Sequence, residues 1–496
     1  MATTTVFTFG GMDDKHDPAS VGTPDSSLRV QDRAYTGCTE IVNGDVDDDD
    51  NISRRSGYSL LAAGNVTSAW GDGVDNLWVV GGALYRYSQG ALNLIGNSPN
   101  LTDRVDFARV NDIVAFSDPY TIGYLKDSVP YVVNVPAQDV DLLDLETWVK
   151  LTYPAGADAP ESNLEIDAFS IATSPGRCLE FFNGALYMAR EIANPTGTAW
   201  FVFCTKTFNM AREDVRFNVV AGFKDEVTMI RGADDGIYVG TTGGVYFLSG
   251  DGIKGSAPGV RGFVQRKILP FGVVRGSDVA VPKTEQKGKD AVAWLSENGV
   301  YLGFPGGQYL DLTADRVNIL ADLSLTAAAL VRQVGASWQY LVCHNGQTIA
   351  VNLKTGAHSR YTNYQFVAFF DQYGANSSGV SVLAGGLDGT AVIDASFTTP
   401  VADFGLPQLK TCSDAYLHAR TDGDLTLDLY VDETEVATDL SFRAPYHPDA
   451  GLRRLRVKLP RGARGTNWQF KIRNVDGCRF TALSLKVTPA ASARSI

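Results

Sequence analysis

The sequence predicts an all-β protein: a β-propeller of six or seven blades with an extended N-terminal arm and a C-terminal β-sandwich. Glycine accounts for 50 of the 496 residues and aromatic residues for 10%, which favours short strands joined by tight turns. A hairpin signal recurs at blade-like intervals through the middle of the chain. Roughly the last 100 residues alternate between apolar and polar side chains with a period of two, which is typical of antiparallel strands.

Residues 1–57 are expected to form an extended arm that ends in a hairpin. The segment from Asp13 to Asp25 is polar and rich in Gly, Pro and Asp, so we expect no regular element there. The acidic run 45–51 lies between short apolar segments and is expected at the hairpin tip. The arm also has apolar residues that no repeat of its own would bury, so we expect them to contact a neighbouring subunit or another protein of the same assembly. These residues are Val6, Phe7, Phe9, Leu28, Val30, Ile41 and Val42.

Residues 58–396 are expected to form the propeller. Asn-Gly, Asp-Gly or Gly-Gly recurs before an apolar residue and a tyrosine, and such turns between apolar runs are a strong hairpin signal because both turn residues adopt positive φ. A repeat of roughly 40–50 residues built from short strands is typical of a propeller blade. We expect Tyr85, Tyr187, Tyr238 and Tyr301 at equivalent positions of separate blades. The alternative is an all-β protein with many hairpins and no circular symmetry. Further copies of the signal end at Tyr246, Ile349 and Val392.

Residues 137–168 interrupt this rhythm. They include Asp139, Asp141, Asp144 and Glu146, followed by a stretch rich in Pro, Gly and Ala from Pro154 to Pro160. Such a length without a strand pattern predicts an insertion that projects from the ring. The insertion is expected either to contact a partner or to be a plain solvated loop.

Residues 397–496 are expected to form the β-sandwich, because three segments alternate with a period of two: 425–431, 455–459 and 468–472. The polar positions of the second segment are basic. This face either binds an acidic partner or is simply the solvated side of a strand. The basic residues are Arg454, Arg456 and Lys458.

Charge and cysteine content narrow the functional classes. The formal net charge of -13 argues against general nucleic-acid binding, because phosphate contacts need Lys and Arg. We find neither a signal peptide pattern nor an apolar stretch of the roughly 18–20 residues that a membrane span needs. The six cysteines are far apart and form no C-x-x-C, which predicts buried free thiols rather than disulfides or a zinc site. They are Cys38, Cys178, Cys204, Cys343, Cys412 and Cys478.

No pattern of residues indicates catalysis, so we expect no catalytic or cofactor-binding residues, no cofactor and no enzymatic activity. The chain has no G-x-S-x-G, phosphate-binding loop or dinucleotide-binding pattern. It also lacks the sialidase sequence box, which argues against an enzymatic propeller. No two of the five histidines have the spacing of ligands on a helix. They are His16, His344, His358, His418 and His447.

One acidic segment partly matches a calcium-binding loop. The first three ligand positions and the apolar position are present, but aspartate replaces the turn glycine and serine replaces the bidentate glutamate. We therefore expect a solvated hairpin tip and no metal site. The positions concerned are Asp45, Asp47, Asp49, Asp50, Ile52 and Ser56.

The two ends of the chain resemble a known family, the tail hub or nozzle β-propeller proteins of short-tailed bacteriophages, which include packaged-DNA stabilisation and tail tubular proteins. Near the N-terminus the resemblance is carried by Ser26–Arg29, Asn43–Asp47 and Ile52–Tyr58, which precede the first expected blade. Near the C-terminus, three segments resemble the family's closing domain. These segments are Ala415–Leu417, Arg453–Lys458 and Phe480–Val487.

The resemblance implies a structural virion protein, located in the tail and in the host cytoplasm during assembly. The family forms rings of six subunits, so the implied partners are copies of the same chain, the adaptor or head-to-tail connector proteins, and tail fibre or tail tip proteins. Genomic DNA would pass through the lumen without specific binding, being first retained and then released. The family has no catalytic residues to transfer. The alternative is a receptor- or glycan-binding propeller, such as an adhesion module or a depolymerase.

Overall fold

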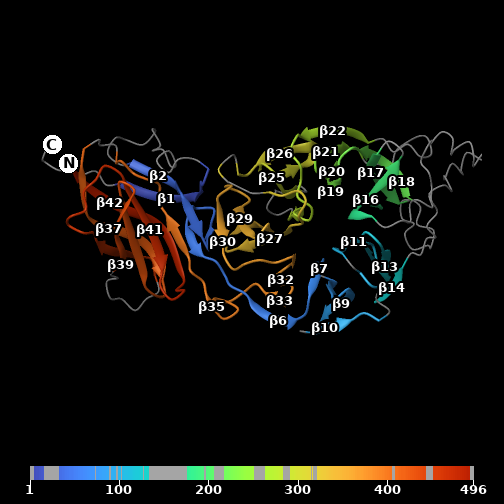
Figure 1. The fold of residues 1–496 in the computed structure, drawn as a ribbon, viewed down its shortest axis with the longest axis horizontal. Helices are drawn as coiled ribbons and strands as arrows, with labels where there is room; N and C mark the ends of the chain where they lie inside the picture. The colour runs from blue at the N-terminus through green and yellow to red at the C-terminus, as the bar shows by residue number, and fades with distance from the viewer. Residues whose placement is uncertain are drawn as a thin grey trace, which may run out of the picture.

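The computed structural model describes residues 5–15, 33–72, 74–88, 91–96, 99–101, 103–126, 128–132, 176–194, 197–205, 217–250, 263–282, 291–313, 316, 321–404, 408–442 and 451–491. Within these ranges the chain is all-β, as predicted, and the only helical element is the 3-10 turn Pro305–Gly307. No helix in the described part of the chain is long and apolar enough to cross a membrane. Figure 1 shows an elongated molecule in which strands from both ends of the chain lie together at one end.

Most of the chain forms antiparallel runs of four strands. Six of these runs are separate sheets, and the seventh, β27–β30, is one end of a larger sheet. The runs are β7 (Val66–Gly71), β8 (Asn76–Val80), β9 (Ala83–Ser88), β10 (Ala91–Leu94); β11 (Asp106–Val110), β12 (Ile113–Ser117), β13 (Ile122–Lys126), β14 (Val129–Val132); β15 (Arg177–Phe182), β16 (Ala185–Asn194), β17 (Gly197–Thr205), β18 (Phe217–Phe223); β19 (Val227–Ala233), β20 (Gly236–Thr241), β21 (Gly244–Ser249), β22 (Val264–Leu269); β23 (Val279–Val281), β24 (Ala291–Ser296), β25 (Gly299–Phe304), β26 (Gln308–Asp311); β27 (Ala328–Val334), β28 (Ser337–His344), β29 (Gln347–Asn352), β30 (His358–Tyr361); and β31 (Ala368–Phe370), β32 (Tyr373–Asn376), β33 (Gly379–Val382), β6 (Ser59–Ala63).

Successive runs contact one another, in most cases through their first strands; the exception is β19, which contacts the second strand of the next run, β24. The pairs β11 and β15, β15 and β19, β23 and β27, and β27 and β31 are in contact, and β31 also contacts β7. At the start of the series, the N–H of Val105 donates a 2.8 Å hydrogen bond to Ser68 Oγ in β7. The contacts therefore lead from the last run back to the first, and Figure 1 shows β7, β11, β19 and β27 around a common centre.

The last run takes its outer strand from the beginning of the series. β6 pairs antiparallel with β33, with Ser59 opposite Val382 and Ala63 opposite Gly379. The hydrogen bonds of this pairing cover an edge that β33 would otherwise expose. The sequence repeat misses this run because it contains no copy of the tyrosine motif. The predicted copy at Val392 is instead in β35 (Ala391–Val392), which forms a separate two-stranded sheet with β34 (Leu387–Asp388).

The predicted turns are confirmed where the glycine is the second residue of a two-residue loop. Asn183 and Gly184 have φ values of 48° and 80°, and Asn345 and Gly346 have values of 48° and 71°, as a type I′ turn requires. The prediction is wrong at Gly236 and Gly299, which are the first residues of their strands. Ala233 pairs with Gly236, and Ser296 pairs with Gly299. The two-residue loops are therefore 234–235 and 297–298, and each ends one residue before the glycine.

The four tyrosines of the repeat lie in four separate sheets, as expected, but their positions are not equivalent. Tyr187 and Tyr238 are in the second strands of their runs, β16 and β20, whereas Tyr85 and Tyr301 are in the third strands, β9 and β25. The motif therefore marks a strand that follows a hairpin, and each run contains more than one hairpin.

Two larger sheets pack face to face beyond the four-stranded runs. One has seven strands and the other continues β30 to give nine. Their apolar side chains form one core. The strands are β1 (Thr5–Met12), β2 (Arg33–Cys38), β4 (Gly44–Val46), β5 (Ile52–Arg54), β37 (Lys410–Thr421), β40 (Arg453–Lys458) and β42 (Phe480–Ala491) in the first, and β3 (Glu40–Val42), β36 (Ser396–Thr398), β38 (Leu425–Val431), β39 (Thr434–Ser441) and β41 (Trp468–Asn474) in the second.

The predicted alternation near the C-terminus is confirmed by burial. Trp468, Phe470 and Ile472 in β41 are fully buried, and the residues between them are half-buried. In β40, the apolar Leu455 and Val457 point into the core while the basic side chains between them are exposed.

The arm's apolar residues were expected to contact another protein. This prediction is wrong for Phe7, Phe9 and Ile41, which lie in the core of the chain itself. Phe7 and Phe9 are fully buried and pack against Phe470 and Phe397 of the same chain, with ring centroids 5.9 and 4.7 Å apart. Ile41 belongs to the same core. The C-terminal strands provide the apolar surface that covers these residues. Leu28, Val30 and the insertion 137–168 lie outside the described residues.

Candidate functional site: a central arginine cavity and a buried arginine joint

A cavity of about 320 Å³ lies where the first strands of the seven runs meet. Each of β7, β11, β15, β19, β23, β27 and β31 contributes lining residues. Its volume is at the lower end of the range of small-molecule pockets. Its polar lining distinguishes it from the apolar cores between the sheets, and the charged residues in and beside it are Arg104, Asp106, Glu180, Arg231, Arg275, Asp278 and Asp371.

On one side of the cavity, Arg231 is paired with two carboxylates. Its Nη1 lies 2.9 Å from Glu180 Oε2, and its Nε lies 2.6 Å from Asp278 Oδ2. Burial lowers the pKa of Arg231, but Asp278 and Glu180 outweigh this effect and hold its pKa above the usual value. Burial also raises the pKa of the Glu180 carboxyl. One guanidinium therefore has two acidic partners here.

On the other side, Arg104 and Arg275 share one carboxylate. Arg104 Nε lies 3.9 Å from Asp106 Oδ1, and Arg275 Nη2 lies 3.5 Å from Asp106 Oδ2. The same aspartate accepts a 2.8 Å hydrogen bond from the N–H of Cys178. Burial is the largest influence on the pKa of Arg104 and lowers it. Both ion pairs are long, so neither guanidinium is closely neutralised.

The glycine that follows Arg275 leaves room for the guanidinium of Arg104. Gly276 has a φ of 76°, and a Cβ at this position would lie 2.3 Å from the guanidinium of Arg104. The turn is held by Ser277, whose hydroxyl donates a 2.7 Å hydrogen bond to the carbonyl of Val274. The loop before β23 therefore presents Arg275 toward the cavity without displacing Arg104.

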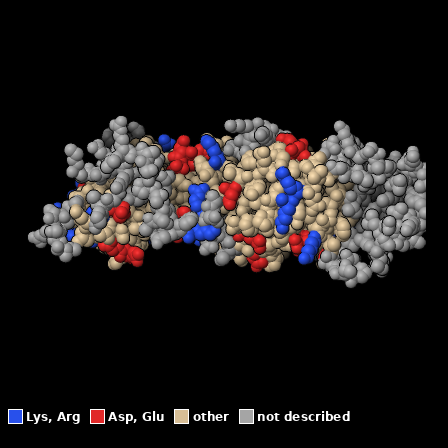
Figure 2. Space-filling view, turned by 90° about the horizontal axis from the view of Figure 1, so that it is seen from above, with Lys and Arg blue, Asp and Glu red and all other residues tan. Residues whose placement is uncertain are grey.

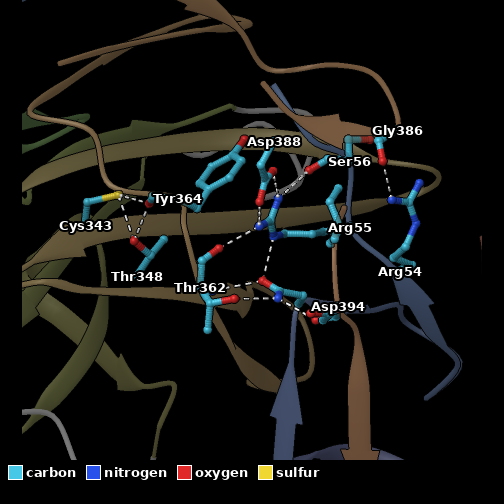
Figure 3. A network of polar contacts seen from close by, with 12 residues as sticks. Arg54, Arg55, Ser56, Cys343, Thr348, Thr362, Tyr364, Gly386, Asp388 and Asp394 are labelled. Carbon is cyan, nitrogen blue, oxygen red and sulfur yellow. Dashed lines mark hydrogen bonds and ion pairs between the residues drawn. The ribbon is translucent and has the colours of Figure 1, made fainter. Parts of the chain in front are cut away.

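A second buried arginine joins distant parts of the chain (Figure 3). Arg55 has no exposed side-chain surface, and it donates to both carboxylate oxygens of Asp388. Its remaining donors reach Asn43 Oδ1 and the carbonyls of Ser56 and Thr362, at 2.7–3.0 Å. All five N–H donors of the guanidinium are thus satisfied, as a buried arginine requires.

Aromatic rings and an asparagine complete this joint. The guanidinium carbon of Arg55 lies 4.6 Å from the ring centroid of Tyr364 and 5.1 Å from that of Tyr361. The amide of Asn43 donates to Thr362 Oγ1 and to the carbonyl of Asp394. The joint therefore connects the β4–β5 hairpin region with β30 and with the segment around β34 and β35.

The acidic run forms the predicted hairpin tip, with Val46 opposite Ile52. Its carboxylates do not converge. Asp45 is buried and accepts hydrogen bonds from the Tyr361 hydroxyl and from Arg332, whereas Asp47 accepts from backbone N–H groups of its own turn. Among the residues that the structure describes, no group of three His, Cys, Asp or Glu side chains could hold a metal ion.

The structure also separates the other residues considered in the sequence. His344, His358 and His418 lie in β28, β30 and β37, and the other two histidines lie outside the described residues. All six cysteines are free thiols. Cys178 lines the central cavity, where burial raises the pKa of its thiol well above the usual value.

The basic face of β40 is partly neutralised. Arg456 forms a 2.8 Å ion pair with Asp414, and the guanidinium of Arg454 lies 4.0 Å from the ring centroid of Tyr416. Among the described residues on the face drawn in Figure 2, basic and acidic side chains form small separate groups rather than a broad field of one sign. These contacts favour the interpretation of a solvated strand face.

Sequence reasoning missed the central cavity because its charged residues come from segments far apart in the chain. The available signal is a charged residue at or within an otherwise apolar strand, such as Glu180 between Leu179 and Phe181, or Arg231 after Ile230. That signal becomes informative only once the first strands of the seven runs are known to line the same cavity.

The chain was compared with known proteins by sequence and by structure. No protein-family model matches the chain, and no characterised protein matches it by sequence. Similar solved structures include the extracellular domain of the putative one component system BT4673 from B. thetaiotaomicron, with 11% identity, a TM-score of 0.37, and coverage of 89% of this chain and 65% of that one. Another is the computationally designed Ika8 protein, with 11% identity, a TM-score of 0.35, and coverage of 67% and 99%. A third is PorZ of Porphyromonas gingivalis, with 13% identity, a TM-score of 0.32, and coverage of 68% and 36%. At these scores the likenesses carry no functional argument.

Proposed function

We propose that the seven four-stranded runs are the blades of a β-propeller and that the two packed sheets are a β-sandwich. The proposal is supported by the cavity that all seven first strands line, and by the contact between β31 and β7. In this arrangement β6 closes the ring, because it completes the last blade with a strand from the start of the series. A ring closed in this way leaves no long unpaired edge between first and last blades.

We propose further that the protein is a structural virion protein, a tail hub or nozzle subunit of a short-tailed bacteriophage. The observation that carries this proposal is the position of the residues behind the family resemblance. Asn43 and Arg55, from two of the three N-terminal segments, form the buried joint with Asp388. The subunits of a DNA conduit need domains whose relative orientation stays fixed while DNA passes. A buried ion pair with all its hydrogen bonds satisfied supports such rigidity.

The charge of the chain supports a conduit through which DNA passes without specific binding. With a net charge of -13, a ring of such subunits would repel the phosphate backbone rather than hold it. The resemblance implies six subunits in the ring, adaptor or connector proteins above it, and fibre or tip proteins below.

Native mass spectrometry of the purified full-length chain tests this proposal, alone and after mixing with the adaptor protein of the same virion. The expected result is a ring of six copies of the 53.4 kDa chain, formed by the chain alone or in the presence of the adaptor. A chain that remains monomeric with the adaptor and binds a surface polysaccharide would overturn the proposal and favour the alternative glycan-binding propeller.

A further inference from the structure

The buried guanidinium of Arg275 lacks the partners that Arg55 has. Its side chain is 9% exposed, its Nε has no hydrogen-bond partner, and its only polar contact in the described part of the chain is the 3.5 Å pair with Asp106. An arginine remains charged at any pH at which the protein is folded, so burial does not remove the need for acceptors. At Arg55 five acceptors meet that need. At Arg275 most donors have none.

The ion pairs around the cavity indicate that a further partner of Arg104 and Arg275 would be negatively charged. Arg104 and Arg275 share the single carboxylate of Asp106, whereas Arg231 has both Glu180 and Asp278. Among the described residues, Arg104 and Arg275 therefore have one ion-pair partner between them, at 3.9 and 3.5 Å, whereas Arg231 has two partners within 2.9 Å. Asp371 also lines the cavity, so its acidic groups are not in short supply overall, and the lack of close carboxylate partners is confined to Arg104 and Arg275.

We propose that the central cavity binds a small oxyanion, with a carboxylate or phosphate group held between the guanidinium groups of Arg104 and Arg275. Both groups line the cavity, whose 320 Å³ has room for a small ligand. The planar fork of N–H donors on a guanidinium matches the oxygens of carboxylate and phosphate and favours bidentate contacts. Asp106 competes with the ligand for both arginines, because its carboxylate offers the same chemistry from within the chain.

The proposal is independent of assembly into a tail, so its test uses the purified full-length protein. Isothermal titration calorimetry in a chloride buffer at constant ionic strength would be performed with inorganic phosphate and, separately, with acetate and succinate. Saturable binding of phosphate alone would assign the site to phosphate, and binding of acetate or succinate would assign it to carboxylates. The absence of saturable binding by all three anions would overturn the proposal.

Variants of the cavity separate this site from adventitious surface binding. Arg275→Gln and Arg104→Gln are each expected to weaken binding about tenfold or more, as the loss of a charge-assisted hydrogen bond implies. Asp106→Asn is expected to tighten binding, because it removes the competing negative charge while its amide oxygen still accepts the N–H of Cys178. Damage to the fold cannot produce tighter binding, so this variant keeps the test decisive if an arginine variant fails to fold.

A matched arginine outside the cavity is the control. Arg109 is 26% exposed and has close carboxylate partners in Asp72 and Asp75, at 2.6 and 2.5 Å. Arg109→Gln is expected to leave anion affinity unchanged. Equal affinity in the wild type, Arg275→Gln and Asp106→Asn would place the anion elsewhere and overturn the proposal.

Discussion

Arg55 and Asp388 form a bidentate ion pair, 2.8 Å from Nη1 to Oδ1 and 2.6 Å from Nη2 to Oδ2, and both side chains are almost wholly buried. The pair joins a segment before the first four-stranded run to one after the last. Removing one partner would leave an unpaired charge at a buried position, which makes the pair a sensitive test of how the parts of the molecule are held together.

We predict that Arg55→Met lowers the free energy of unfolding by about 3–5 kcal/mol, because the carboxylate of Asp388 would remain buried without its partner. Chemical denaturation followed by circular dichroism measures this loss. The double variant Arg55→Met with Asp388→Leu is expected to recover part of the stability. The exposed pair of Arg456 and Asp414 is the control, and Arg456→Met is expected to change stability little. A similar small effect of Arg55→Met would contradict the assigned role of the joint.

Phe7→Ala is expected to lower the free energy of unfolding by about 3–5 kcal/mol, because it leaves a cavity in the core between the two large sheets. Val6, the adjacent residue on the other face of β1, is only half-buried, and Val6→Ala should cost clearly less. Thermal and urea unfolding of the two purified variants make the comparison. Equal effects would show that β1 does not pack as described.

Removing residues 1–15 is expected to destabilise the folded chain itself, since β1 lies between β2 and β42 in the seven-stranded sheet. This differs from the behaviour of an arm that serves only as a contact with another subunit. The measurement is the yield and melting temperature of the truncated chain beside the full-length chain. A truncated chain that melts at the wild-type temperature would restore the interpretation of a detachable arm.

Gly57 is expected to be intolerant of alanine. A Cβ at this position would lie 1.9 Å from the carbonyl oxygen of Leu387, a backbone atom, so the segments that meet at the Arg55 joint would have to separate. Gly96→Ala is the matched control, because no atom lies within 4 Å of the corresponding Cβ. We expect Gly57→Ala to lower the melting temperature and Gly96→Ala to leave it near the wild-type value. The same melting temperature for both variants would contradict the close approach at Leu387.

Stability is predicted to fall as the pH drops below about 6.5, in part because of His358. Burial, reinforced by Arg316, lowers the pKa of this histidine to about 3 in the folded chain, from an ordinary value of 6.5. The unfolded chain therefore takes up a proton that the folded chain excludes, so the contribution is complete above pH 6.5 and is lost progressively toward pH 3. Urea denaturation at several pH values should show a shallower decline for His358→Gln than for the wild type. Identical slopes would exclude this histidine as the source.

The sequence was sufficient for features that depend on neighbouring residues. Period-two alternation predicted the buried face of β41 at Trp468, Phe470 and Ile472, because successive side chains of a strand point to opposite faces whatever it pairs with. Asn183-Gly184 predicted a turn with two positive φ values because few other dipeptides adopt that conformation without strain. Gly236 shows the limit of such signals, since the register of the paired strands decided which two residues formed the loop.

By itself, then, the sequence determined the all-β class, the hairpins and the alternation of the late strands, which are set by backbone conformation and side-chain direction over a few residues. Only the tertiary structure decided where Phe7 is buried and which acceptors surround Arg55 and Arg275. The reason is physical: burial and charge pairing depend on which distant strands share a surface, and nothing in the local chain specifies that partner. The same apolar residue serves a core or an interface, and the same arginine is satisfied or left short of acceptors, according to what the fold places opposite it.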